Sequence, residues 1–397
     1  MKTQFLSAAK KLFLLLGVWM NVLPAMRAQE LGESCYYYLG DYPASKPTLG
    51  WQEDVQGVAH DEDHWFITRT DIMWKIPVGH DLDYNRDPSP VPTVSIGDVT
   101  QLREEGYIYW GDPECYERRG QTFLLVPVYG GPGGPPHPAI ALFRADLLAY
   151  VDTAVLNEQS GAPWCAVDPQ GNVYSSNFDV DSDNPIHKYT VDWDRVIDSG
   201  EFGLSLTNQI PLKDESGTVM SLPRVQGGVI PPNGMLIYLV AGFFDQLLST
   251  DGIHVFDLGS GRRVRRSTLG FGSFNFEFYP GMFEPAQEPE GLTFWDLDDG
   301  RAPGISGQLH VLLLDNDAAG ADDVFFKHYT GTLHVDRSYS DTEIGSLREP
   351  FNTVNEANDL IWDGAQIKIS SGSYPEALTF SKRMAVVPSG GPVTIGR

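Results

Sequence analysis

The feature that most constrains the fold is a strand-turn-strand unit that recurs along the first 330 residues. Each copy is an apolar run, a turn rich in Asp, Asn, Pro or Gly, and a second apolar or aromatic run, which is typical of a hairpin. The copies begin at Val55, Ile96, Pro163, Val225 and Glu290. Because one such unit cannot bury both of its faces alone, the units must pack against one another.

A third strand is expected after every copy, in the segments Ile72–Ile76, Ala139–Phe143, Ile186–Val191, Gly252–Phe256 and Val324–Tyr329. Alternating apolar and polar residues in these segments put one face on a core and the other toward solvent. Units of three or four strands bury their faces when they stack radially. Over about residues 35–330 the chain therefore resembles secreted β-propellers of the five- or six-bladed kind.

This resemblance implies a mostly β fold with five blades, or six if the strand around Tyr36–Tyr38 contributes a closing blade. The 41 glycines and 28 prolines agree with a globular protein rich in turns. A pair of β-sandwiches is the alternative, because sandwiches also show short strands separated by turn signals.

The N-terminal residues 1–28 have the pattern of a secretory signal peptide. Three lysines precede an apolar run from Leu12 to Leu23, and small residues follow at suitable cleavage points. We therefore expect a secreted or periplasmic protein without a membrane span in the mature chain. A retained N-terminal anchor helix is the alternative, although the apolar run is short for a membrane span.

The charge limits the classes of partner that the chain can bind, and the cysteine content limits the kinds of disulfide or metal site that it can form. Removing residues 1–28 takes away four basic and no acidic residues, so the net charge falls from −25 to −29. This acidity argues against nucleic acid and anionic membranes as partners. Cys35, Cys115 and Cys165 are too few and too widely spaced for a disulfide framework or a zinc knuckle.

The sequence changes character after Tyr329. A polar lead-in, the segment Pro350–Ala357 and later runs such as Gly364–Ile369 resemble the opening of a right-handed parallel β-helix of the pectin-lyase-like kind. A short capping helix over about Phe351–Leu360 would place Phe351, Val354, Ala357 and Leu360 on one apolar face.

These patterns predict a signal peptide at residues 1–28, a β-propeller at 29–330 and an incomplete β-helix-like module at 331–397. Solenoids need about three repeats for stability, and the last segment supplies little more than one coil. We expect it to be a truncated remnant. The alternative is a stub that docks on the propeller or on a second chain.

One loop resembles the first half of a calcium-binding loop. Asp179, Asp181 and Asp183 alternate there, and carboxylates at alternate positions suit Ca²⁺. The loop also departs from the calcium pattern, with Asn184 in place of the usual glycine and Thr190 in place of the final glutamate. We name calcium as the candidate cofactor and a solvated hairpin loop as the alternative.

In a propeller, the residues that flank the innermost strands line the mouth of the central channel. By their position in the repeat, the candidate ligand-binding residues are Gln56, His60, Asp98, Trp164, Gln226, Glu288 and Glu290. Carboxylates from different blades could hold a metal or act as acid and base. The alternative is that these side chains only close the channel by hydrogen bonds between blades.

Two functions follow from this pattern. The first is a secreted binding protein that takes a glycan, a peptide or an envelope protein at the channel mouth. It rests on the absence of a nucleophile elbow, a phosphate loop or a zinc motif from the sequence. The second is a metal-assisted, calcium-dependent hydrolase or lyase acting on a phosphoester, a lactone or a polysaccharide, which Glu288, Glu290 and Asp98 together suggest.

Overall fold

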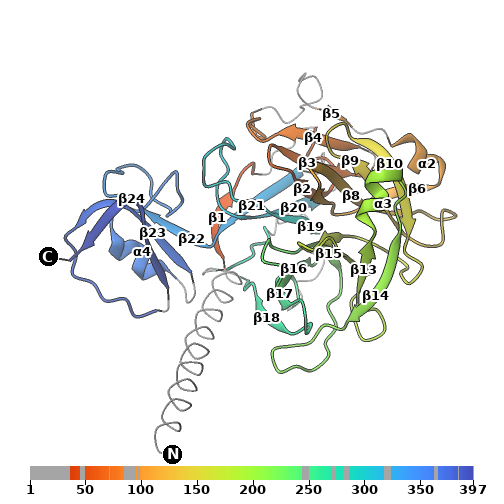
Figure 1. Cartoon of the computed structure of the whole chain (residues 1–397). Coiled ribbons are helices and arrows are strands. Elements are labelled where there is room, and N and C mark those ends of the chain that lie inside the picture. Colours follow the sequence, from red (N-terminus) through yellow and green to blue (C-terminus); the bar gives the residue numbers. More distant parts are fainter. Residues whose placement is uncertain are drawn as a thin grey trace, which may run out of the picture. The chain divides into compact units, whose positions relative to one another are not determined.

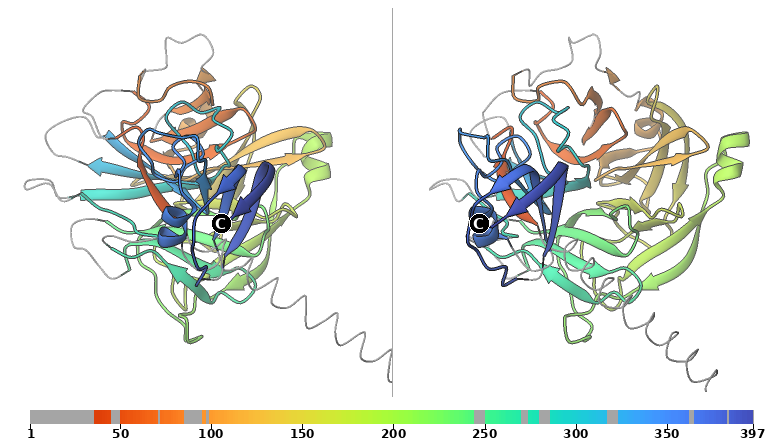
Figure 2. Two further views of the ribbon diagram at one scale, coloured as in Figure 1. Left: turned by 90° about the vertical axis from the view of Figure 1, so that its left-hand side faces the viewer. Right: turned by 60° about the vertical axis from the view of Figure 1, so that its left-hand side comes forward.

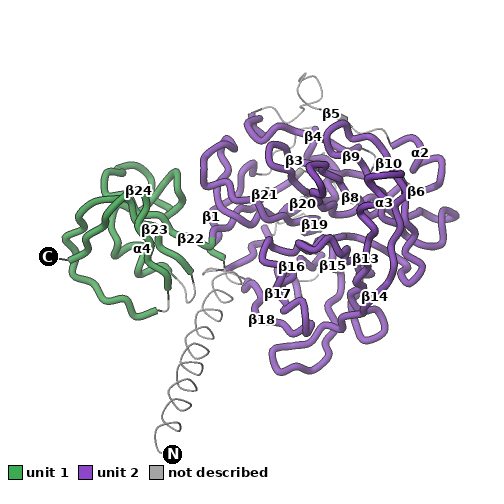
Figure 3. Tube along the Cα trace, in the orientation of Figure 1, with its two compact units in different colours: residues 1–37, 331–397 green, residues 38–330 purple. Residues whose placement is uncertain are grey.

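The computed structural model describes residues 36–44, 50–70, 72–84, 95–96, 99–243, 250–269, 274–279, 286–316, 323–361, 365–382 and 384–396. The predicted signal peptide lies outside these ranges. The chain divides into two compact units, residues 38–330 and residues 1–37 with 331–397 (Figure 3). No helix in the described ranges is long and apolar enough to cross a membrane.

The larger unit consists of five antiparallel sheets, which Figures 1 and 2 show arranged around a common centre. The first blade contains β2 (Val55–His60), β3 (His64–Arg69), β4 (Met73–Pro77) and β5 (Ser95–Ile96). The third contains β11 (Cys165–Val167), β12 (Val173–Ser175), β13 (Ile186–Val191) and β14 (Leu204–Ile210), and helix α3 (Trp193–Ser199) joins its last two strands. The fourth contains β15 (Val225–Val229), β16 (Leu236–Ala241), β17 (Gly252–Asp257) and β18 (Arg263–Arg266).

The fifth blade joins the two ends of this unit. Its strands, from the axis outward, are β19 (Ala286–Phe294), β20 (Leu309–Asn316), β21 (Asp323–Thr330) and β1 (Tyr37–Asp41). The prediction of five blades is confirmed. The segment around Tyr36–Tyr38 adds the outermost strand of the fifth blade and does not form a sixth, because its backbone pairs with β21.

The second blade differs from the other four. Helix α2 (Thr100–Glu104) precedes an inner strand in two pieces, β6 (Tyr107–Trp110) and β7 (Glu114–Arg118), which both pair with β8 (Gln121–Gly130). Strands β9 (Ala139–Arg144) and β10 (Ala149–Val155) complete the blade. The predicted hairpin beginning at Ile96 was therefore wrong, because Ile96 ends the outer strand of the first blade and α2 separates it from β6.

Local turn chemistry explains the hairpins. Between β11 and β12, Asp168 Oδ1 accepts hydrogen bonds from the backbone N–H groups of Gln170 and Asn172 at 3.0 and 2.9 Å. Gly171 has φ 84° in this turn, a backbone conformation that glycine adopts without steric cost. The turn of the β15–β16 hairpin is formed in the same way, by Asn233 and Gly234.

The core of the propeller lies between neighbouring blades. Trp65, Trp110 and Trp164 are completely buried there, in different interblade clusters. Trp65 packs edge-on against Trp295 with ring centroids 4.5 Å apart, which joins the first blade to the fifth. Burial of one large apolar side chain stabilises a fold by roughly 1.5–3 kcal/mol, so these interfaces hold the blades in a closed ring.

The smaller unit contains a parallel sheet of β22 (Thr332–Val335), β23 (Gln366–Tyr374) and β24 (Ala385–Ile395), with helix α4 (Val354–Leu360) between the first two strands. A capping box of Thr353 and Glu356 begins α4. Val354 and Ala357 are buried as predicted, whereas Leu360 is 44% exposed, because the helix ends there and the next residue, Ile361, is buried instead. Three parallel strands do not by themselves make a β-helix, which stays a prediction.

Candidate ligand site at the propeller axis

Three inner strands share one irregularity at the axis. The pairing of β2 with β3 shifts between Val55 and Gly57, and equivalent shifts occur in β15 and β19. The residues left out of the ladder are Gln56, Gln226 and Glu290, all predicted ligand-binding positions. A β-bulge bends its strand and re-aims the extra side chain, so the same device displays one polar side chain from each of three blades.

A glycine follows each bulged residue, and in each case it lies against Asp112. A Cβ atom added to Gly57 would lie 2.3 Å from the Cα atom of Asp112, and one added to Gly291 would lie 2.4 Å from Asp112 Oδ1. At Gly227 the corresponding distance to Asp112 Oδ2 is 3.0 Å. The three glycines therefore make room for one carboxylate at the centre of the ring.

Asp112 lies between β6 and β7 and is completely buried. Its Oδ1 accepts a hydrogen bond from the N–H of Val58 at 3.0 Å, and Oδ2 accepts from Gly228 at 3.1 Å and Leu292 at 3.3 Å. Its backbone N–H donates to Pro163 O at 2.8 Å. Asp112, a residue of the second blade, therefore contacts each of the other four blades. Burial raises the pKa of Asp112, and the three N–H donors oppose that rise because they stabilise the carboxylate.

Glu288 and Glu290 form a carboxyl pair beside Asp112. Glu290 is 4% exposed, and burial, the charge of Glu288 and a hydrogen bond between the two side chains raise its pKa well above the usual range. Gln226 Nε2, from the neighbouring blade, donates to Glu288 Oε2 at 3.2 Å. A proton on Glu290 with a carboxylate on Glu288 satisfies these contacts.

Three aromatic rings lie on the second- and third-blade side of this pair. Tyr109 stacks on Tyr129 with centroids 5.2 Å apart, and Phe178 meets Tyr129 edge-on at 5.6 Å. Glu290 and Glu288 both contribute to raising the pKa of the Tyr129 phenol, after the larger effect of burial, which places this ring close to the carboxyl pair. Tyr109 is 37% exposed, so the aromatic group has an accessible edge.

The other predicted site residues lie elsewhere or are engaged. Trp164 is completely buried, packs where Gly228 leaves space, and donates to Ser176 Oγ at 3.0 Å, so it is a packing residue. His60 stacks on Trp295 with ring centroids 4.4 Å apart, and its ring nitrogens contact the backbone oxygens of Asp61 and Phe294. Asp98 lies outside the described residues.

The predicted calcium loop is organised by hydrogen bonds of its own. Asp181 Oδ1 accepts from the backbone N–H groups of Asp183 and Asn184 at 2.8 and 2.9 Å, which closes a turn. Asp179 Oδ1 accepts from the N–H of Arg224 at 3.0 Å. Among the described residues, no group of three or more His, Cys, Asp or Glu side chains could hold a metal ion.

Sequence reasoning missed two acidic residues of the axis, Asp112 and Glu114. Glu114 is two positions after Asp112 and begins β7, in the inner strand of the second blade. Burial raises its pKa to about 8. The segment Gly111-Asp112-Pro113 interrupts that strand and conceals the repeat. Gly111 abuts Pro163 O as closely as Gly57 abuts Asp112, but this close approach is visible only in the structure.

The comparisons with known proteins place this geometry among solved structures only distantly. No family model matches the chain, and no curated protein matches its sequence. The GH43_1 enzyme from Xanthomonas citri is 11% identical over 76% of this chain and 92% of that chain, with a TM-score of 0.43.

Two further structures have similarly low scores. An exo-1,5-alpha-L-arabinanase from a bovine ruminal metagenomic library is 12% identical over 69% of this chain and 92% of that chain, with a TM-score of 0.36. The glutaminyl cyclase of Myxococcus xanthus is 9% identical over 74% and 96%, with a TM-score of 0.39. Similarities this weak carry no argument about function, which rests on the geometry of this chain.

Proposed function

We propose that the propeller binds a glycan at the axis, on the side of Glu288 and Glu290. The observation that carries the proposal is the position of the Glu288–Glu290 carboxyl pair, with the amide of Gln226, close to the ring of Tyr129. The second bulged amide, Gln56, comes from the first blade and is half-buried at the same axis.

This combination suits a sugar because a sugar ring has both an apolar face of C–H groups and a rim of hydroxyls. Aromatic rings such as Tyr109 and Tyr129 pack on the apolar face. Hydroxyls donate to the carboxylate of Glu288 and exchange hydrogen bonds with the amide of Gln226. A few converging polar groups beside an aromatic wall fix the orientation of such a ligand.

Isothermal titration calorimetry against a panel of plant and bacterial oligosaccharides tests this proposal. Glu288→Gln and Tyr129→Ala should each weaken binding at least tenfold. Asp198→Asn, which removes an exposed carboxylate from α3, should leave the affinity unchanged. Failure to bind any glycan, or equal affinities in all the variants, would overturn the proposal.

A hydrolase or lyase is the second candidate, and one observation favours it. A buried glutamic acid with a raised pKa is a suitable general acid, and burial together with the charge of Glu288 raises the pKa of Glu290. Glycosidases place two carboxyl groups about 5–10 Å apart, whereas Glu288 and Glu290 are hydrogen-bonded to one another and supply one shared proton. This difference is why binding comes first.

Product analysis separates the two candidates. An enzyme would release reducing ends or unsaturated products from a polysaccharide, and Glu290→Gln would abolish the release while retaining some affinity. Calcium binding is tested by a separate measurement of thermal stability. If Asp179, Asp181 and Asp183 bind Ca²⁺, a chelator should lower the melting temperature and Asp181→Ala should remove that response.

Export and a β-helical C-terminal module complete the proposal. Sequencing the N-terminus of secreted material should find a start between Met26 and Glu30, and an intact Met1 would contradict export. The parallel pairing of β22 with β23 and of β23 with β24 agrees with a right-handed β-helix, in which the crossover β22–α4–β23 would be right-handed. An experimental structure with a left-handed crossover there would overturn it.

A further inference from the structure

We propose that Asp112 is a positioning residue, which holds the bulged side chains of Gln56, Gln226 and Glu290 in the arrangement that the glycan site uses. This inference deepens the proposed function and rests on it for the role of those side chains. It makes one buried carboxylate responsible for aligning polar groups from three blades.

The pattern of hydrogen bonds carries the argument. Each N–H that donates to Asp112 belongs to the residue two positions after a bulged side chain: Val58 follows Gln56, Gly228 follows Gln226, and Leu292 follows Glu290. A β-bulge leaves its extra residue without a ladder partner, so the local backbone needs another anchor. In all three blades that anchor is the same carboxylate.

The contacts across the axis are equally tight. A Cβ atom on Gly291 would lie 2.7 Å from the Cα atom of Gly57, and one on Gly227 would lie 2.9 Å from the Cα atom of Gly291. The three bulged strands therefore approach one another as closely as backbone allows, with Asp112 between them. A displacement of this carboxylate must move all three bulges.

Asp112 also acts on the proton of Glu290. The groups that face Glu290 and raise its pKa, after the effect of burial, are Glu288 and Asp112. Tyr129 lies nearby as a phenol whose own pKa is raised. Glu114, the first residue of β7, faces Asp112 from two positions further along the chain. Removing the charge of Asp112 should therefore lower the pKa of Glu290, since a like charge nearby disfavours the ionised form.

The test does not require a ligand. In full-length protein labelled with ¹³C-glutamate, the Glu290 carboxyl resonance is assigned with Glu290→Gln and then titrated in the wild type and in Asp112→Asn. We expect the apparent pKa of Glu290 to be lower in Asp112→Asn than in the wild type. Asp198→Asn is the control, because it removes an exposed carboxylate on α3 that pairs with Arg119. An unchanged titration in a folded Asp112→Asn protein would overturn the proposal.

A second measurement covers the possibility that Asp112→Asn does not fold. In the wild type, the amide protons of Val58, Gly228 and Leu292 should have closely similar protection factors against exchange with solvent, because one carboxylate holds them all. Three unrelated protection factors would overturn the proposal. If Glu290 titrates as expected and no glycan binds, the positioning role stands and the proposed function fails.

Discussion

The ε-ammonium of Lys327 lies 3.3 Å from the carboxylate of Asp41, although the two residues are 286 positions apart. Lys327 is on β21 and Asp41 ends β1, so this ion pair joins the two ends of the propeller. The side chain of Lys327 is completely buried, and the ring of Tyr279 lies 4.4 Å from its nitrogen. Burial lowers the pKa of Lys327 to about 8, while Asp41 opposes that shift.

Asp41→Asn should therefore destabilise the propeller by about 3 kcal/mol or more, because it leaves a buried ammonium without its counter-charge. Replacing both partners, in Asp41→Asn with Lys327→Met, should restore most of that loss, since an apolar side chain suits the aromatic surroundings. Urea denaturation at pH 7 measures both variants. A double variant no more stable than the single one would show that the ion pair is not what Asp41 contributes.

The close approach at the axis gives a second prediction, in Gly57→Ala. The added methyl group would lie 2.3 Å from the Cα atom of Asp112, where neither backbone can give way. We expect a loss of roughly 3 kcal/mol, at the upper end of the usual cost of overpacking. Gly203→Ala is the matched control, because no atom lies within 4 Å of the added group. Equal stabilities of the two variants in urea would contradict the axial packing described above.

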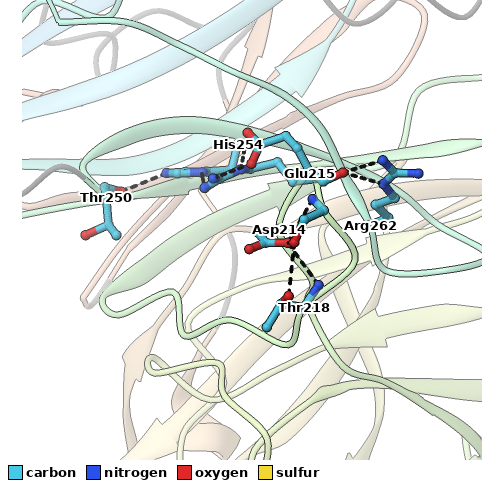
Figure 4. A network of polar contacts seen from close by, with 8 residues as sticks. Asp214, Glu215, Thr218, Thr250, His254 and Arg262 are labelled. Carbon is cyan, nitrogen blue, oxygen red and sulfur yellow. Dashed lines mark hydrogen bonds and ion pairs between the residues drawn. The ribbon is translucent and has the colours of Figure 1, made fainter.

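A third prediction concerns acid stability and the network in Figure 4. The Nε2 atom of His254 lies 2.8 Å from Thr250 O, and Nδ1 lies 3.4 Å from a guanidinium nitrogen of Arg263. A neutral ring that donates from Nε2 and accepts at Nδ1 satisfies both contacts. Glu215 holds Arg263 through two bonds of 2.9 Å, which fixes the cation beside the ring.

Burial, with a smaller contribution from the cation of Arg263, lowers the pKa of His254 to about 4. The unfolded chain then binds the proton more tightly than the folded one, so stability is lost as the pH falls from about 6.5 to about 4, by roughly 3 kcal/mol for this group. His254→Gln keeps both hydrogen-bonding roles without titrating. Its stability should fall less than that of the wild type between pH 6.5 and 4, and parallel curves would refute the assignment.

The sequence predicted the blades because their signals are local. The third strands are visible as alternating apolar and polar residues. The Gln-Gly pairs at Gln56 and Gln226 mark inner strands that carry bulges in the structure. Asp112 could not be found in this way. Its partners Val58 and Leu292 are 54 and 180 positions distant, and nothing near Asp112 in the sequence indicates them. The closing role of β1 was hidden for the same reason, since its partner strand is at the other end of the unit.

The last prediction concerns Glu114, whose pKa burial raises to about 8. A carboxyl group with a folded pKa above its unfolded value stabilises the fold fully below about pH 4.5, and this contribution is lost as the pH rises through about 8. The loss should be on the order of a few kcal/mol at most, because the side chain is partly exposed.

Glu114→Gln mimics the protonated acid and should remove this dependence. The variant should match the wild type at pH 5 and exceed its stability at pH 9, when both are measured by urea denaturation. Glu117→Gln serves as the control, since it removes an exposed carboxylate from the same strand and should shift both values equally. If Glu114→Gln and Glu117→Gln have the same pH dependence, Glu114 does not hold its proton in the folded protein.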